Sequence, residues 1–134
     1  LTEHAVVNDF GRAQARMGEL EALGVVLVQD DFGTGHASLS TLHKLPFKAL
    51  KIDRSFVAEM ATDERAARIV EASTHLARPL KLGVVAEGVE TAAQFERLRA
   101  LGCHAFQGWH FSRDLPLDRL AHWLRANGIQ RDAA

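Results

Sequence analysis

Apolar and polar residues alternate along the chain in two patterns. Apolar side chains at helical spacing predict helices, whereas short apolar runs bounded by glycine, proline or acidic residues predict buried strands. Helices are expected at residues 11–23, about 38–45, 61–77, 91–101 and 117–126. Strands are expected at residues 25–30, 49–53, 82–87 and 105–107. Four strands separated by helices predict parallel βαβ units, and therefore an α/β fold.

Each predicted strand ends on polar or charged residues. These are Asp30 and Asp31, then Lys51 and Asp53, then Glu87, and finally Gln107. Because the carboxyl ends of parallel strands meet at one edge of the sheet, we expect these side chains around one opening, as in a TIM barrel. No Gly-rich dinucleotide-binding turn follows any strand, which argues against a doubly wound sheet.

Asp30 and Asp31 are adjacent carboxylates directly after an apolar run. Successive side chains of a strand point to opposite faces, so both reach one site only where the backbone turns. We expect this turn at the strand end, where Gly33 and Gly35 allow it. Paired carboxylates suit a hard cation such as Mg²⁺. A helix cap or a solvated turn is the alternative interpretation.

The other candidate residues also have structural alternatives. Lys51 is a candidate site residue, but it would also suit a structural pair with Asp53. Glu90 lies where a helix begins, and a carboxylate there can simply favour the first turn. Gln107 can serve the site or only satisfy backbone groups. Trp109 follows closely and can either pack or line the opening.

Composition narrows the picture further. A chain of 134 residues is one domain at most, and we place its boundaries at 1–130 with a polar tail at 131–134. The formal net charge of −1 gives no global attraction for a nucleic-acid polymer or an anionic membrane. The single cysteine, Cys103, excludes an intrachain disulfide, suits a reducing compartment and is expected to be buried. No apolar run is long enough to span a membrane. We expect a cytoplasmic segment without membrane contact, with any anchor of the parent protein outside it.

Four motifs occur in order along nearly the whole chain. They are DDFGTG at 30–35, LKIDRSFV at 50–57, VVAEGVET at 84–91 and QGWHFS at 107–112, with LTE at 1–3 before them. In sequence and separation they resemble the C-terminal half of an EAL domain, the family of cyclic di-GMP phosphodiesterases. The resemblance implies the C-terminal half of a TIM-like (βα)₈ barrel.

The resemblance also implies an activity and a site. The activity is metal-dependent hydrolysis of cyclic di-GMP to linear pGpG, with two Mg²⁺ or Mn²⁺ ions. The catalytic residues carried over are Asp30, Asp31, Lys51 and Glu87. Asp30 would bridge two metal ions, Asp31 would bind one, Glu87 would contact a metal ion or its water, and Lys51 would orient the attacking water.

Four further residues are carried over with supporting roles. Glu90 would support the residues around the metal ions, and Gln107 would lie beside the metal-bound water. Glu3 would anchor the loop after Asp31, and Asp53 would contact the ligand.

Three metal ligands that the family pattern contains would lie outside this chain, upstream of Leu1. They are the glutamate of the E-A-L signature, an asparagine, and the first glutamate of the E-x-T-E motif. We therefore expect a fragment of a longer protein that is inactive alone. The alternative function is a degenerate domain that binds cyclic di-GMP as a sensor without cleaving it. Half a barrel leaves strand edges unpaired, so we expect self-association or packing against the missing N-terminal half.

Overall fold

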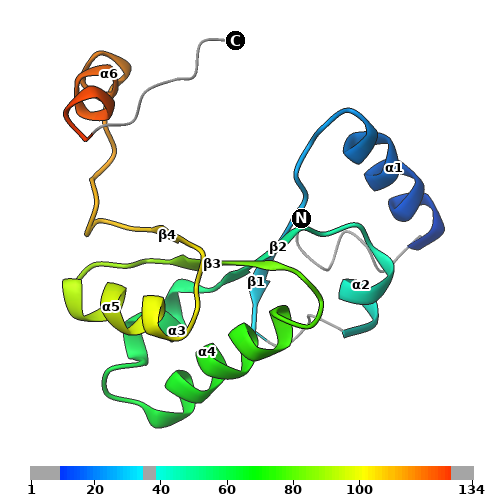
Figure 1. Cartoon of the computed structure of the whole chain (residues 1–134), viewed down its shortest axis with the longest axis horizontal. Coiled ribbons are helices and arrows are strands. Elements are labelled where there is room, and N and C mark those ends of the chain that lie inside the picture. The colour runs from blue at the N-terminus through cyan, green and yellow to red at the C-terminus, as the bar shows by residue number, and fades with distance from the viewer. Residues whose placement is uncertain (1–9, 35–38, 128–134) are drawn as a thin grey trace.

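Four parallel strands form one sheet in the computed structural model, which describes residues 10–34 and 39–127 (Figure 1). The strands are β1 (Val28–Phe32), β2 (Ala49–Ile52), β3 (Gly83–Glu87) and β4 (Ala105–Gln107), and they lie in sequence order. The described helices are α1 (Phe10–Ala22), α2 (Leu39–Lys44), α3 (Arg54–Glu59), α4 (Glu64–Ala77), α5 (Ala92–Ala100) and α6 (Leu117–Ala126). Sequential order of parallel strands is the arrangement found in a (βα)₈ barrel.

The two faces of the sheet differ in their cover. Leu50, Ile52, Val84 and Ala86 are buried, and they belong to one hydrophobic core with side chains from α3, α4 and α5. The alternate positions of β2 and β3 are only partly buried. Figure 1 shows α3, α4 and α5 on the same side of the strands. The predicted α/β fold with four parallel strands and flanking helices is confirmed.

The first strand differs from its predicted bounds of 25–30. Val25 and Val26 are exposed, Val26 to 66%, and precede the strand although they are apolar. At the other end, the strand continues to Phe32, which is 9% exposed and belongs to the core. Most of the apolar run at 25–28 therefore precedes β1, whereas Asp30 and Asp31 lie inside the strand.

The region after β2 also differs from the prediction. The expected helix at 61–77 begins later, at Glu64, where the Asp63 side chain accepts a hydrogen bond from the Arg65 amide. A separate short helix, α3, precedes it and was not predicted. Six residues are too few to show helical periodicity, so only a capping residue could have indicated α3. The strand at 105–107 and the helix at 117–126 match their predicted bounds.

The burial of Cys103 and the character of the described helices agree with what the composition predicts. Cys103 is buried, and burial raises the pKa of its thiol to about 11, as expected for a small core residue and not for a reactive thiolate. Within the described ranges, no helix combines the length and apolar character needed to cross a membrane. The 131–134 tail lies outside the described residues.

Candidate active site

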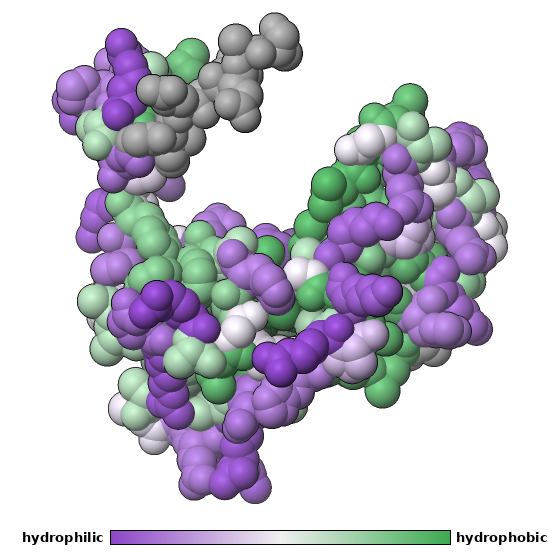
Figure 2. All heavy atoms as spheres, in the orientation of Figure 1, coloured by the Kyte–Doolittle hydropathy of each residue, from purple (hydrophilic) through white to green (hydrophobic). Residues whose placement is uncertain are grey.

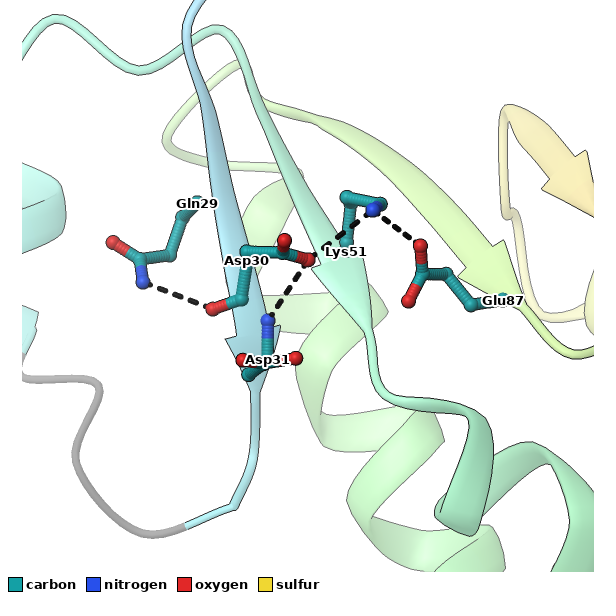
Figure 3. A network of polar contacts seen from close by, with 5 residues as sticks. All are labelled: Gln29, Asp30, Asp31, Lys51 and Glu87. Carbon is teal, nitrogen blue, oxygen red and sulfur yellow. Dashed lines mark hydrogen bonds and ion pairs between the residues drawn. The ribbon is translucent and has the colours of Figure 1, made fainter. Parts of the chain in front are cut away.

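Side chains from three neighbouring strands meet on the partly buried face of the sheet (Figure 3). Lys51 of β2 lies between Asp30 of β1 and Glu87 of β3. Its Nζ is 3.2 Å from Asp30 Oδ1 and forms a second ion pair with Glu87 Oε1. The three side chains are 20–35% exposed, so solvent screens them only in part. The parallel sheet thus brings one ammonium and two carboxylates together.

The charge state of Lys51 follows from these contacts. The hydrogen bond to Glu87 is the largest cause of a raised Lys51 pKa, and Asp30 raises it further, whereas partial burial lowers it. The net shift is upward from 10.5, so Lys51 is a cation at neutral pH. It can offset negative charge or donate hydrogen bonds, but it cannot accept a proton.

A β-bulge lies at Asp30 and Asp31, and of these two side chains only that of Asp30 pairs with Lys51 among the described ion pairs. Gln29 is opposite Leu50 and Phe32 is opposite Ile52, so β1 has one more residue than β2 over this stretch. Asp31 has a φ of 53°, and its amide donates to Asp30 Oδ1 at 3.2 Å. The expected turn at the strand end is present at Gly33, where the Thr34 amide donates to the Asp31 carbonyl at 3.4 Å, but it follows the acidic pair and does not place it. The backbone turns inside β1, at the acidic pair itself.

Gly33 also allows a close contact between the chain and α3. Gly33 has a φ of 103°, and a Cβ at this position would lie 2.8 Å from Phe56 Cε2. A glycine is needed there because the chain leaves β1 against an aromatic ring of α3. Gly35 lies outside the described residues.

Glu90 and Gln107 lie farther along the same edge. Register pairs Glu87 with Gln107 across β3 and β4, and the Gln107 carbonyl accepts from the Val89 amide at 3.0 Å. Together with Glu87, both residues line a cleft of about 290 Å³ that Trp109 also borders. Glu90 is exposed, and its backbone amide donates to Gln94 Oε1. Glu90 and Gln107 thus border the same cleft as Glu87. The hydrogen bond to the Val89 amide is made by the backbone carbonyl of Gln107, so both interpretations of its side chain stay predictions.

Arg54 adds to the predicted set of this cleft, whereas Trp109 was predicted with two alternatives. Arg54 lines it from the first position of α3, and the sequence offered no signal for it beyond its place after Asp53. Trp109 is 57% exposed, and the Arg113 guanidinium lies 4.5 Å from its ring centre. Trp109 therefore lines the opening, the second of the two interpretations of this residue.

Asp53 has a structural role in the described residues. Its Oδ1 accepts hydrogen bonds from the amide and the hydroxyl of Ser55, which caps α3. The Ser55 hydroxyl is the largest cause of a lowered Asp53 pKa. No ion pair joins Lys51 to Asp53 in the described part of the chain; Lys51 pairs with Asp30 and Glu87 instead. A contact between Asp53 and a ligand stays a prediction, and Glu3 lies outside the described residues.

The carboxylates suit a hard divalent cation, because oxygen ligands are those that Mg²⁺, Mn²⁺ and Ca²⁺ prefer. Within residues 10–34 and 39–127, however, no three His, Cys, Asp or Glu side chains lie close enough to form a metal site. Asp30 and Glu87 share one ammonium instead. The donor set fits such a cation in kind, and further ligands would have to come from beyond these ranges.

Comparison with known proteins connects this geometry to a family. The family model of the EAL domain matches residues 1–114. NbdA, a cyclic di-GMP phosphodiesterase of Pseudomonas aeruginosa, is 44% identical over 126 residues, which are 94% of this chain and 16% of NbdA. The chain thus spans about a sixth of the length of such curated relatives, and it aligns with their C-terminal part.

Solved structures agree with this match. The MucR phosphodiesterase of P. aeruginosa in complex with c-di-GMP has a TM-score of 0.83 and 45% identity, over 90% of this chain and 49% of that structure. BlrP1 of Klebsiella pneumoniae, solved with manganese and cyclic di-GMP, has a TM-score of 0.74 and 33% identity, over 84% of this chain and 29% of BlrP1. A calcium complex of BlrP1 is equally similar.

Proposed function

Because the chain belongs to the EAL domain family, we propose that the protein containing it hydrolyses cyclic di-GMP to linear pGpG. Asp30, Asp31, Lys51 and Glu87 are this chain's catalytic contribution. The observation that supports the proposal most is the position of Lys51 between Asp30 and Glu87 on adjacent strands. The chain spans only part of its relatives, so the remaining site residues come from outside it, and the chain alone is inactive.

The proposed cofactor is a pair of Mg²⁺ or Mn²⁺ ions. The manganese and calcium complexes of BlrP1 support a divalent cation in this family. Asp30, Asp31 and Glu87 would hold the ions together with ligands from the missing part of the domain. When bound, such ions activate water and stabilise the charge that develops on the phosphodiester.

The chain's own residues have distinct tasks in this proposal. Lys51 holds Asp30 and Glu87 in place and donates a hydrogen bond to the attacking water or a phosphate oxygen. Its raised pKa keeps this ammonium charged, so another group must accept the water's proton.

The supporting residues act around this centre. Glu90 and Gln107 keep the Glu87 side of the cleft polar. Asp53 contacts the substrate, and Glu3 anchors the loop after Asp31. The protein acts on a soluble dinucleotide, and we place this segment in the cytoplasm.

A chimaera tests the proposal. The upstream part of the MucR EAL domain is fused before Leu1, and circular dichroism verifies folding. With Mg²⁺ or Mn²⁺, chromatography should detect the linear dinucleotide from the chimaera and none from the 134-residue chain. Calorimetry with Ca²⁺ measures binding of cyclic di-GMP separately. A folded chimaera that binds the ligand and leaves it intact would favour the sensor alternative.

A further inference from the structure

A second cavity lies at the opposite edge of the sheet from Lys51. It has a volume of about 480 Å³, within the range of small-molecule sites, which is roughly 300–1,000 Å³. Its walls are the turns that follow α4 and α5 and the first residue of β3. The proposed catalytic function does not use this cavity.

The charged and imidazole side chains that line this cavity are hydrogen-bond donors. Arg78 and Lys81 are exposed cations, and neither forms an ion pair within the described residues. His104 Nδ1 accepts the Val84 amide at 3.1 Å, so the neutral imidazole carries its proton on Nε2. None of the described residues that line the cavity has a carboxylate. The donors therefore favour an anion.

Helices α4 and α5 end at this cavity. Binding to their last carbonyl groups would be a purely structural reason for the basic side chains here. Basic side chains near a helix C-terminus often interact with these carbonyls. Here backbone amides of the turns already bind several of them. The Leu82 amide donates to the Ala77 carbonyl at 3.0 Å, and the Cys103 amide donates to the Leu98 carbonyl at 3.1 Å. The cations are thus not needed to satisfy these groups.

The backbone of Lys81 provides an independent observation. Its φ is 56°, a left-handed conformation that is unfavourable for a residue with a Cβ. Glycine would fit this turn without that cost. A strained backbone at a lysine suggests that its side chain has a function.

We propose that this cavity binds a small phosphorylated molecule. Arg78, Lys81 and the Nε2 proton of His104 contact the phosphate. The aliphatic side chains of Leu82 and Leu101, which also line the cavity, contact the uncharged portion of the ligand. Arg78 and Lys81 supply the positive charge for this phosphate, so its binding requires no divalent cation.

Titration of the 134-residue chain tests this site without reference to catalysis. Inorganic phosphate and adenosine monophosphate are added at low ionic strength without divalent cations, and amide shifts of Gly83, Gly102 and His104 are followed by NMR. Both ligands should shift these amides. Arg78→Gln and Lys81→Gly should each weaken binding at least tenfold.

Two controls separate loss of the phosphate contacts from unfolding and from a general effect of charge. Lys81→Gly should also raise the melting temperature, because glycine relieves the left-handed backbone, so lost binding would not reflect unfolding. Arg68→Gln removes one positive charge from α4, away from the cavity, where Arg68 pairs with Glu64 at 2.6 Å, and should bind phosphate like the parent. Equal weakening in all three variants, or no binding of phosphate by the parent, would refute the site.

Discussion

Lys51 determines the charge balance of the candidate active site. Its ammonium offsets part of the repulsion between Asp30 and Glu87, which would otherwise face each other across β2. Their approach was predictable from the sequence, because parallel strands must end at one edge. The pairing partners of Lys51 were not, since Asp53 lies two residues away and offered another carboxylate.

Asp53 illustrates how a predicted ligand contact can coincide with a helix cap. We expect Asp53→Ala to lower the free energy of unfolding by about 1 kcal/mol at pH 7, because α3 loses its N-cap. Asp53→Asn should retain most of that stability, since asparagine is also a good cap. Urea unfolding of the three proteins measures the difference. An unchanged stability in Asp53→Ala would show that the cap is dispensable.

The stability difference between the parent and the Asp53 variants should depend on pH. The folded-state pKa of Asp53 is lowered below 3.8, so its charged form stabilises the protein above pH 3.8. This stability is lost as the pH falls through the folded-state value. The advantage of the parent over Asp53→Asn should therefore shrink between pH 5 and the acid range. If the stability difference between the parent and Asp53→Asn did not change with pH, the Ser55 hydrogen bonds would not be what stabilises the charged form of Asp53.

At the scale of elements, the bulge in β1 places the acidic pair and could not be predicted. Alternation along a strand predicts opposite directions for Asp30 and Asp31, and a bulge depends on the register with β2, which emerges only on folding. The helix α3 was missed for a related reason. Its stability comes from the Asp53 cap and from packing of Val57, not from a long periodic pattern.

The close approach of Gly108, which follows β4, to Val89, which follows β3, yields a prediction at this scale. A Cβ at position 108 would lie 2.1 Å from the Val89 carbonyl oxygen, and backbone atoms cannot move aside as a side-chain tip can. We expect Gly108→Ala to destabilise the protein by about 1–3 kcal/mol, the usual cost of overpacking. Thermal unfolding measures it.

Gly18 in α1 provides the control for that variant. A Cβ at this position has nothing within 4 Å, and alanine is the better helix former. Gly18→Ala should therefore stabilise the protein by roughly 0.5–1 kcal/mol. If Gly108→Ala and Gly18→Ala changed the stability equally, the short distance to Val89 would not be what requires glycine at position 108.

For the whole molecule, the sheet is covered on one face and open on the other. Helix α6 has no buried residue and lies apart from the sheet (Figure 1). Leu23, Val25 and Val26 are exposed at the end of α1 and the segment after it, where Figure 2 shows apolar surface. The motif order predicted this half of a barrel, but the sequence could not say which apolar residues stay exposed.

Open edges and exposed apolar surface predict association. In sedimentation velocity, the 134-residue chain should form dimers or larger species at micromolar concentration. The chimaera with the upstream MucR segment should sediment as a smaller, more uniform species, because that segment covers the open face. A monodisperse 134-residue monomer with a cooperative melt would contradict the prediction.

The rate of cyclic di-GMP hydrolysis by the chimaera, with and without Lys51→Ala, tests the central claim most directly. We expect Lys51→Ala to reduce turnover with Mn²⁺ by at least a hundredfold while circular dichroism shows an unchanged fold. Arg68→Gln should hydrolyse at the parent rate. Near-normal turnover in Lys51→Ala would contradict the claim that the cluster of Asp30, Lys51 and Glu87 carries the chemistry.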